Sequence, residues 1–199
     1  MNGKDILPIE QQRAMRETDY FDPRNIADEF KGMDTETIKA ILKLRSSRLV
    51  VMCSNEIKDF NWGSVVRSAN SFGAHEIMFT GRKSYNRRGA VGANNYSDIH
   101  YMSSTSEAIA YYRAKEYRIV AIEYDENYSM QNLQTYDWSE SSVILFGEEG
   151  RSLPAEILDQ CDDVVYVPMY GSVRSLNLAS CATVVMYDYD TKIRQTPTY

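Results

Sequence analysis

The chain has 199 residues, which fits one ordinary domain with a short appendage. Its hydrophobic content of 43% and charged content of 25% are typical of a soluble globular protein, and no apolar run reaches membrane-spanning length. A net charge of −6 argues against indiscriminate binding to nucleic acids but leaves room for a local basic patch.

The N-terminal quarter predicts helical structure. Its first residues are polar and mixed in charge, which is not the pattern of a secretory signal. Apolar periodicity predicts helices at residues 4–18 and 34–46, separated by a polar segment around Pro23. We therefore expect residues 1–47 to form a helical extension ahead of the main domain.

From residue 48 onward, short apolar runs alternate with helical segments. Strands are expected at 48–53, 76–80, 118–123, 142–146 and 164–167. Helices are expected at about 63–72, at 106–116 with Ser106 as its cap, and at 175–188. This alternation predicts an α/β fold, with a mostly parallel sheet and helices on both faces, and ligands at the carboxyl ends of the strands.

The cysteines are Cys53, Cys161 and Cys181, each beside apolar residues and none in a C-x-x-C pair. Reduced, buried thiols in a cytoplasmic protein are the expected state. With only two histidines in the chain, no metal site is expected.

Polar residues mark the start of the helix expected at 63–72. Asn61 and Gly63 lie at this start, and Arg67 follows Gly63 by four residues, so that Arg67 and the helix N-terminus face the same side. Together they form a donor-rich surface suited to phosphate or to a developing oxyanion. The alternative is an ordinary surface arginine.

A dense basic segment occupies residues 81–89, where a tyrosine and an asparagine lie among four cations between two glycines. The cations are Arg82, Lys83, Arg87 and Arg88. This composition is typical of a mobile loop that holds phosphates and stacks a base, with a solvated turn as the alternative.

Two further loops follow predicted strands. In the loop that begins at Gly147, the glycine allows close approach of the backbone to a ligand, and Glu149 can orient an arginine or accept from a hydroxyl. After the last strand, Pro168 ends the ladder, and Ser175 and Asn177 open an apolar helix whose polar tip is expected to face a site.

In this order and spacing, these segments resemble the three motifs of the SpoU/TrmH family of RNA ribose 2′-O-methyltransferases, part of the trefoil-knotted SPOUT superfamily. The first motif is N-x-G-x-x-x-R with a trailing FGA (61–74), the second is FGEEGRSLP (146–154) and the third is VPMYGSVRSLNLA (167–179). The resemblance covers residues 48 to about 190, so a methyltransferase domain at 48–199 is expected after the extension at 1–47.

The resemblance implies a C-terminal trefoil knot that holds S-adenosylmethionine in a bent shape. It also implies a homodimer with the active site at the interface, and a tRNA or rRNA substrate with neither DNA nor a membrane as partner. The implied cofactor-binding residues are Phe146, Gly147, Val167, Met169 and Leu176. The implied catalytic set is Asn61, Arg67, Glu149, Ser175 and Asn177. The residues assigned to RNA are Arg82, Lys83, Arg87, Arg88 and Arg174.

Within this set, Arg67 is expected to position a phosphate and stabilise the ribose oxyanion, because a guanidinium remains protonated and makes a poor base. Glu149 is expected to hold Arg67 in place. Ser175 and Asn177 are expected to orient the ribose or the cofactor-binding helix.

Two residues depart from the family's pattern. Trp62 replaces a smaller aliphatic residue and is expected to pack at the dimer interface or to stack on RNA. Glu148 adds a second carboxylate, whose negative charge is expected near the RNA. Arg174 is expected either to offset this charge or to contact the RNA backbone. The separate RNA-binding domain of some relatives is expected to be absent, which leaves RNA recognition to residues 1–47, the basic segment and the partner subunit.

Two alternatives remain open. One is a catalytically silent RNA-binding relative, against which the intact catalytic set argues. The other is a knotted methyltransferase that acts on a base nitrogen, against which the form of the motifs argues.

Overall fold

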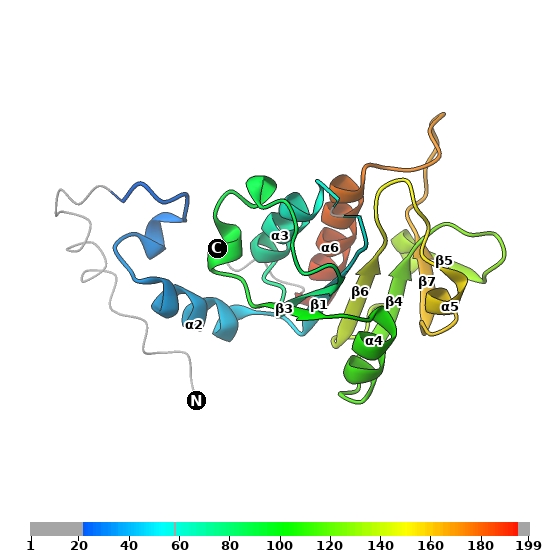
Figure 1. Cartoon of the computed structure of the whole chain (residues 1–199), viewed down its shortest axis with the longest axis horizontal. Helices are drawn as coiled ribbons and strands as arrows, with labels where there is room; N and C mark the ends of the chain where they lie inside the picture. Colours follow the sequence, from blue (N-terminus) through cyan, green and yellow to red (C-terminus); the bar gives the residue numbers. More distant parts are fainter. Residues whose placement is uncertain (1–21, 58, 195–199) are drawn as a thin grey trace.

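The computed structural model describes residues 22–57 and 59–194, so the helix predicted at 4–18 lies outside the described residues. Seven parallel strands form one sheet in the order β3-β2-β1-β6-β4-β7-β5 (Figure 1). The strands are β1 (Leu49–Asn55), β2 (Glu76–Gly81), β3 (Ile99–Met102), β4 (Arg118–Ile122), β5 (Met130–Asn132), β6 (Ser142–Phe146) and β7 (Asp163–Tyr166). The predicted α/β class and parallel sheet are confirmed.

Helices cover both faces of the sheet, as predicted. They are α2 (Thr35–Arg45), α3 (Trp62–Ser71), α4 (Thr105–Arg113), α5 (Ala155–Leu158) and α6 (Leu178–Arg194), with 3-10 turns η1 (Asp28–Phe30), η2 (Arg88–Ala90), η3 (Ala93–Asn95) and η4 (Leu133–Thr135). Along β1, Val51 and Cys53 belong to the hydrophobic cluster that includes α3 and α6. The alternate residues Val50 and Met52 belong to the cluster that includes α4 and α5. The alternation follows from the opposite orientation of successive strand side chains.

The sequence patterns did not predict the two edge strands, β3 and β5, or the short helix α5. Every residue of β1 and β6 is buried, and such continuous apolar runs identify central parallel strands. By contrast, β3 reads IHYM and β5 reads MQN, and both are partly exposed. Short edge strands need no apolar run, because one side of their ladder faces solvent.

Two helix starts differ from the prediction. The cap of α4 is Ser104, whose side chain accepts from Glu107 N at 3.3 Å, so Ser106 lies inside the helix. Helix α6 begins at Leu178, and Asn177 caps it by accepting from the amides of Ala179 (3.1 Å) and Ser180 (3.3 Å). Ser175 therefore belongs to the preceding loop.

The segment before β1 has a small core of its own. Helix α2 is capped by Asp34, which accepts from Thr37 N at 2.8 Å. Phe30 and Ile38 are buried in a cluster with Tyr96, next to η3, and the segment extends to one side of the sheet (Figure 1). Within the described residues, no helix is long and apolar enough to cross a membrane.

Helix α6 connects distant parts of the chain. It packs beside α3, where Thr183 and Ser68 share a hydrogen bond of 2.8 Å. Farther along, Asp188 accepts from Trp138 Nε1 at 2.8 Å, and Lys192 donates to Leu133 O at 2.7 Å. The third motif thus leads into a helix fixed against both the first motif and the η4 region, while the knot itself stays a prediction.

Candidate active site

The predicted cofactor residues line one cavity at the carboxyl edge of the sheet. Its volume is about 820 Å³. All five residues line it: Phe146, Gly147, Val167, Met169 and Leu176. Glu149, Arg174 and Ser175 contribute to the same wall. The second and third motifs therefore meet around one ligand-sized space, which we call the motif cavity.

A hydrogen-bonded network joins all three motifs beside this cavity. Glu149 Oε2 accepts from Asn61 Nδ2 at 2.8 Å, from Asn177 Nδ2 at 2.7 Å and from Leu178 N at 2.9 Å. Asn177 Nδ2 also donates to Asn61 Oδ1 at 2.9 Å. Residues 116 positions apart in the sequence are thus held in direct contact.

The asparagines of this network have no amide hydrogens left. Both Nδ2 hydrogens of Asn177 are used, and its Oδ1 caps α6. Both Nδ2 hydrogens of Asn61 are used as well, by Glu149 and by Asp59. Glu149 Oε1 accepts from none of the described residues. The asparagines therefore fix geometry, and a carboxylate oxygen is left free at the site.

Arg67 lies on α3 with an exposed side chain. Within the described part of the chain its guanidinium makes no hydrogen bond or ion pair. The expectation that Glu149 holds Arg67 is wrong, because the two side chains form no hydrogen bond or ion pair. Glu149 Oε2 instead accepts from Asn61, Asn177 and the first amide of α6. With no partner among the described residues, the Arg67 guanidinium is available to an anionic ligand.

Asp59 is a site residue that the sequence reasoning missed. Its side chain is buried, and Oδ1 accepts from both Asn61 N and Asn61 Nδ2 at 2.8 Å. Its Oδ2 accepts from Glu149 N at 2.7 Å. The D-x-N pattern is a signal for a local turn of this kind, but nothing in it indicates the second contact.

Glu148 is buried in the loop and lines both cavities at this edge. It is only 7% exposed and accepts from Ile57 N at 2.5 Å, and the expected negative charge near the RNA stays a prediction. Gly147 lies in a tightly packed part of the loop. A Cβ there would lie 3.2 Å from Arg151 O and 3.3 Å from Leu153 Cγ.

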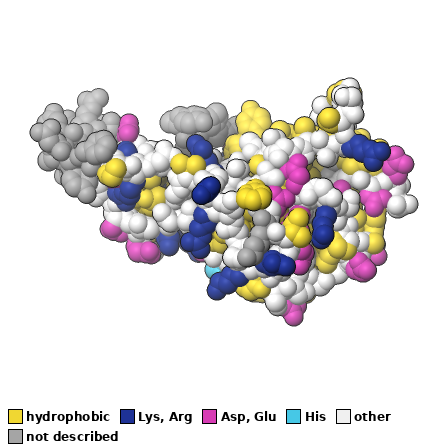
Figure 2. All heavy atoms as spheres, turned by 45° about the horizontal axis from the view of Figure 1, so that its top comes forward, with side chains coloured by type: hydrophobic (Ala, Val, Ile, Leu, Met, Phe, Trp, Pro, Cys, Tyr) yellow, Lys and Arg dark blue, Asp and Glu magenta, His cyan; other side chains and the backbone are white. Residues whose placement is uncertain are grey.

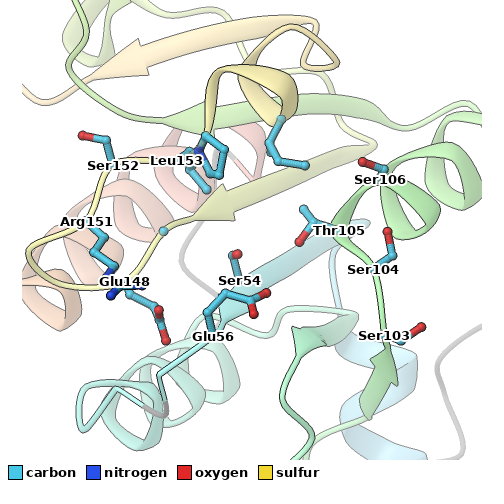
Figure 3. Close-up of a pocket in the computed structure, with 13 residues that line it drawn as sticks. Ser54, Glu56, Ser103, Ser104, Thr105, Ser106, Glu148, Arg151, Ser152 and Leu153 are labelled. Atoms are coloured by element: carbon cyan, nitrogen blue, oxygen red, sulfur yellow. The ribbon is translucent and has the colours of Figure 1, made fainter.

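A second cavity, of about 640 Å³, lies on the other side of the second motif. Figure 3 shows it between Glu148 and Arg151 on one wall and the serines at the start of α4 on the other. Its floor includes Ser54, at the end of β1, which is 9% exposed. The two cavities share Gly147, Glu148, Arg151 and Ser152.

The loop between β7 and α6 projects from the molecule at the same edge (Figure 1, orange). Tyr170 is 89% and Val173 65% exposed, and Arg174 and Ser175 are exposed as well. Arg174 and Ser175 thus combine exposed side chains with a place in the wall of the motif cavity.

The basic loop has an anchored backbone. Asn55 Nδ2 donates to Arg82 O at 2.6 Å and to Ser84 O at 3.1 Å. Tyr85 is half-buried and stacks on Phe79, with ring centroids 4.4 Å apart. The expectation that Tyr85 stacks on a base is therefore wrong for that face of the ring, because Phe79 occupies it.

The same loop covers the start of α3. A Cβ on Gly63 would lie 2.5 Å from Asn86 O and 2.9 Å from Gly89 N, so the glycine is required for this close approach of the loop. Trp62 is fully buried in the core of its own chain, edge-to-face with Phe79. It therefore neither packs at a dimer interface nor stacks on RNA.

The cations of this loop are exposed, and their side chains form no salt bridge with the described residues. They are Arg82, Lys83, Arg87 and Arg88. Figure 2, which turns the top of Figure 1 forward, shows basic and acidic side chains interspersed over this face. Any anion-binding property is therefore local to such groups.

The cysteines are free thiols, as expected. Cys181 lines the motif cavity, and burial together with the nearby Glu123 raises its pKa to about 11. Burial also raises the pKa of Cys161 to about 12. At neutral pH these side chains are neutral and are poor nucleophiles.

Comparison with known proteins identifies the family. The model of the SpoU rRNA Methylase family matches residues 48–187. The tRNA (guanosine(18)-2′-O)-methyltransferase of Escherichia coli K12 is 24% identical over 151 residues, covering 74% of this chain and 65% of that protein. An uncharacterized tRNA/rRNA methyltransferase of Mycobacterium marinum is 29% identical, covering 69% of this chain and 45% of that protein. The chain thus matches less than two thirds of the length of these relatives.

Solved structures agree with this result. The SpoU methyltransferase AviRb from Streptomyces viridochromogenes, in complex with AdoMet, is 25% identical with a TM-score of 0.66, covering 77% of this chain and 60% of that chain. The A. aeolicus TrmH/SpoU tRNA modifying enzyme is 20% identical with a TM-score of 0.71, covering 81% of this chain and 83% of that chain. With a family match over most of its length and its motif residues gathered around one cavity, the chain belongs to the SpoU rRNA methylase family.

Proposed function

We propose that this protein transfers a methyl group from S-adenosylmethionine to a ribose 2′-OH of tRNA or rRNA. The observation that carries the proposal is the junction of the three motifs, where the motif cavity adjoins the Asn61–Glu149–Asn177 network. The names of the relatives, which include a tRNA (guanosine(18)-2′-O)-methyltransferase and an uncharacterized tRNA/rRNA methyltransferase, support the same reaction.

The motif cavity fits the proposed cofactor. Apolar walls from Ile122, Val167 and Leu178 suit the faces of an adenine ring. The carboxylates of Glu126 and Glu149 suit the cationic half of the molecule. The AviRb structure, crystallised with AdoMet, supports this assignment. When bound, the cofactor supplies an activated methyl group on a sulfonium.

The chain's own residues supply alignment and charge. We assign Arg67 to the substrate's phosphate and to the ribose oxygen as it loses its proton, since its guanidinium is exposed and has no partner among the described residues. Ser175 lines the cavity and orients the ribose. Asn61 and Asn177 hold Glu149 in place, with Glu149 Oε1 left free to accept a hydrogen bond or proton from the 2′-OH.

RNA recognition is assigned to the exposed cations. Arg82, Lys83, Arg87, Arg88 and Arg174 carry exposed side chains at or near the carboxyl edge of the sheet. Residues 1–47, as an extension ahead of the methyltransferase domain at 48–199, would add to this surface. Because tRNA and rRNA occur in the cytoplasm, we place the protein there.

We further propose a homodimer in which the partner subunit completes the RNA site. Helix α6 supports it, because Val184 and Tyr187 are 44% and 59% exposed while its other apolar side chains are buried or partly buried. Sedimentation equilibrium tests this state, and a monomer at micromolar concentration with full activity would refute it.

The experiment for the function combines binding and transfer. Calorimetric titration with S-adenosylmethionine should give saturable binding, and methyl label should pass to unmodified tRNA or rRNA transcripts. Cofactor binding without transfer to any RNA would favour the silent relative. Label on a base nitrogen would favour the base methyltransferase. Mapping 2′-O-methyl sites in RNA from cells with and without the gene would identify the nucleotide.

A further inference from the structure

Two buried carboxylates join the loop after β1 to the loop after β6, in opposite directions. Glu148 accepts from Ile57 N at 2.5 Å, and Asp59 accepts from Glu149 N at 2.7 Å. The exposed fractions of Glu148 and Asp59 are 7% and 8%. We call this pair of bonds the loop clamp. It fixes the backbone of the first motif's loop to that of the second, across about 90 sequence positions.

Asp59 does more than join the loops. Its Oδ1 accepts from the backbone and side-chain nitrogens of Asn61, while its Oδ2 accepts from Glu149 N. Asn61 in turn donates to Glu149 Oε2 at 2.8 Å. One carboxylate therefore fixes both partners of the bond between Asn61 and Glu149, one through each of its oxygens.

Fold stability alone is a poor reason for this carboxylate. No cation of the described residues lies within salt-bridge distance of Asp59. A buried carboxylate without a cation carries a desolvation penalty that hydrogen bonds only partly offset. A chain that needed only a stable loop would be served as well by a neutral group, whereas a carboxylate accepts in both directions at once.

We propose that Asp59 is a positioning residue for methyl transfer, which acts by fixing Asn61 and Glu149 and through them the start of α6. Asp59 lines neither cavity, so it acts through these residues and not by contact with substrate or cofactor. The inference rests on the proposed function and names a residue outside the set that the motifs supplied.

The substitution Asp59→Asn separates the two contacts of this carboxylate. The amide oxygen of asparagine still accepts from Asn61, but its NH₂ group faces Glu149 N, so two donors oppose each other. The variant therefore keeps the local turn and breaks only the bond between the loops. Asp59→Ala removes both.

The matched control is Asp125→Asn. Asp125 Oδ1 accepts from Asn127 N at 3.0 Å and from Asn127 Nδ2 at 2.8 Å, which repeats the local turn of Asp59 and Asn61. No described residue donates to its second oxygen. This control carries the same loss of charge in the same type of turn, without a bond between loops.

The test is steady-state methyl transfer to an RNA that the wild type methylates, with rates expressed per cofactor-binding site so that unfolded protein does not count. We expect kcat to fall about 10- to 100-fold for Asp59→Asn, because small misplacements of reacting groups have effects of that size. The RNA KM and the cofactor Kd should stay within about threefold of wild type, since their contacts are retained. Asp59→Ala should fall at least as far as Asp59→Asn.

Two results would overturn the proposal. One is a wild-type kcat for Asp59→Asn. The other is an equal loss for Asp125→Asn, which would trace the effect to the loss of a carboxylate charge in such a turn and not to the bond between the loops. If the wild type transfers no methyl group to any RNA, the proposed function fails, and this outcome is distinct from both. The result in favour is a selective loss of kcat at Asp59.

Discussion

The motif network and the basic loop lie along the same edge of the sheet, yet they use their polar side chains in opposite ways. In the network, Asn61, Glu149 and Asn177 bond to one another and to backbone amides. In the basic loop, the backbone is anchored through Asn55 while the cationic side chains point to solvent. The first arrangement fixes positions, and the second leaves charge available to a ligand.

This difference separates the residues expected to act in catalysis from those expected to bind the RNA. Side chains without spare donors determine where a reacting group sits, so their loss should lower kcat. Exposed cations on a fixed backbone determine how strongly a polyanion is held, so their loss should raise KM and change its salt dependence. Arg67 combines the two properties, because its guanidinium has no partner in the described part of the chain but lies on the helix that the first motif begins.

The largest effect is expected for Arg67→Ala. Removing a cation from a developing oxyanion should lower kcat/KM about 10³-fold, or roughly 4 kcal/mol, with cofactor binding retained. Methyl-transfer kinetics and a cofactor titration measure the two quantities. Arg113→Ala, at the end of α4, removes a cation elsewhere and should keep normal activity. Near-normal turnover by Arg67→Ala would contradict its assigned role.

The next effect is expected for Asn177→Ala. It removes the contacts with Asn61 and Glu149 together with the cap of α6, so kcat should fall about 10-fold or more. The free energy of unfolding should also fall by about 1 kcal/mol through loss of the cap. Asp34→Ala removes the cap of α2 and should show the stability loss without the kinetic one. Matching kinetic losses in the two variants would make the effect one of stability alone.

A smaller effect is expected for the double variant Arg87→Ala/Arg88→Ala. Loss of two phosphate contacts should raise the RNA KM about 10-fold and lower the slope of log KM against log salt by roughly 1.4, with kcat unchanged. Steady-state assays at 50 and 200 mM salt, roughly the range over which such contacts weaken, give both values. Arg113→Ala/Lys115→Ala removes the same charge near the end of α4. A lowered kcat at normal KM would place the basic loop in the catalytic machinery.

The smallest effect concerns the amino ends of the strands, away from both regions. Burial of Asp163 raises its pKa, but hydrogen bonds from Arg118, Tyr136 and Gln131 outweigh burial and leave the pKa below its usual value. A lowered carboxyl pKa stabilises the fold above about pH 4, and this stabilisation disappears as the pH falls through the folded-state value.

Asp163→Asn should therefore cost roughly 1 to 2 kcal/mol at pH 7 and less at pH 3, with normal methyl transfer. Urea unfolding at the two pH values measures the difference. An equal loss of unfolding free energy at pH 7 and pH 3 would show that the charge of Asp163 contributes nothing to stability.

Much of the fold follows from local patterns. Strands β1 and β6 are buried along their whole length, and a strand of this kind has a continuous apolar sequence. Their composition alone therefore predicts them. The stop of α3 at Phe72-Gly73 was also predictable, because Gly73 adopts a φ of +60° that favours glycine. The edge strands β3 and β5 could not be found in this way, since their pairing depends on neighbours and not on their own sequence.

The site was predictable as a set of residues but not as a set of contacts. The motif pattern identified Glu149 and Asn177, whereas their pairing is a tertiary contact with no local signal. The orientations of Glu148 and Tyr85 likewise depend on Ile57 and Phe79, which lie in other segments of the chain. The role of Asp59 could not be predicted, because the hydrogen bond from Glu149 N to its Oδ2 joins loops 90 positions apart in the sequence.

The most direct test of the central claim is the chemical form of the methylated product. Purified protein, S-adenosylmethionine with a labelled methyl group and unmodified tRNA and rRNA transcripts are incubated, and the RNA is digested to nucleosides for mass spectrometry. Our account predicts label on the ribose of one nucleoside, as a 2′-O-methyl group that protects the adjacent phosphodiester from alkali. Label on a base, or cofactor binding with no labelled RNA, would contradict it.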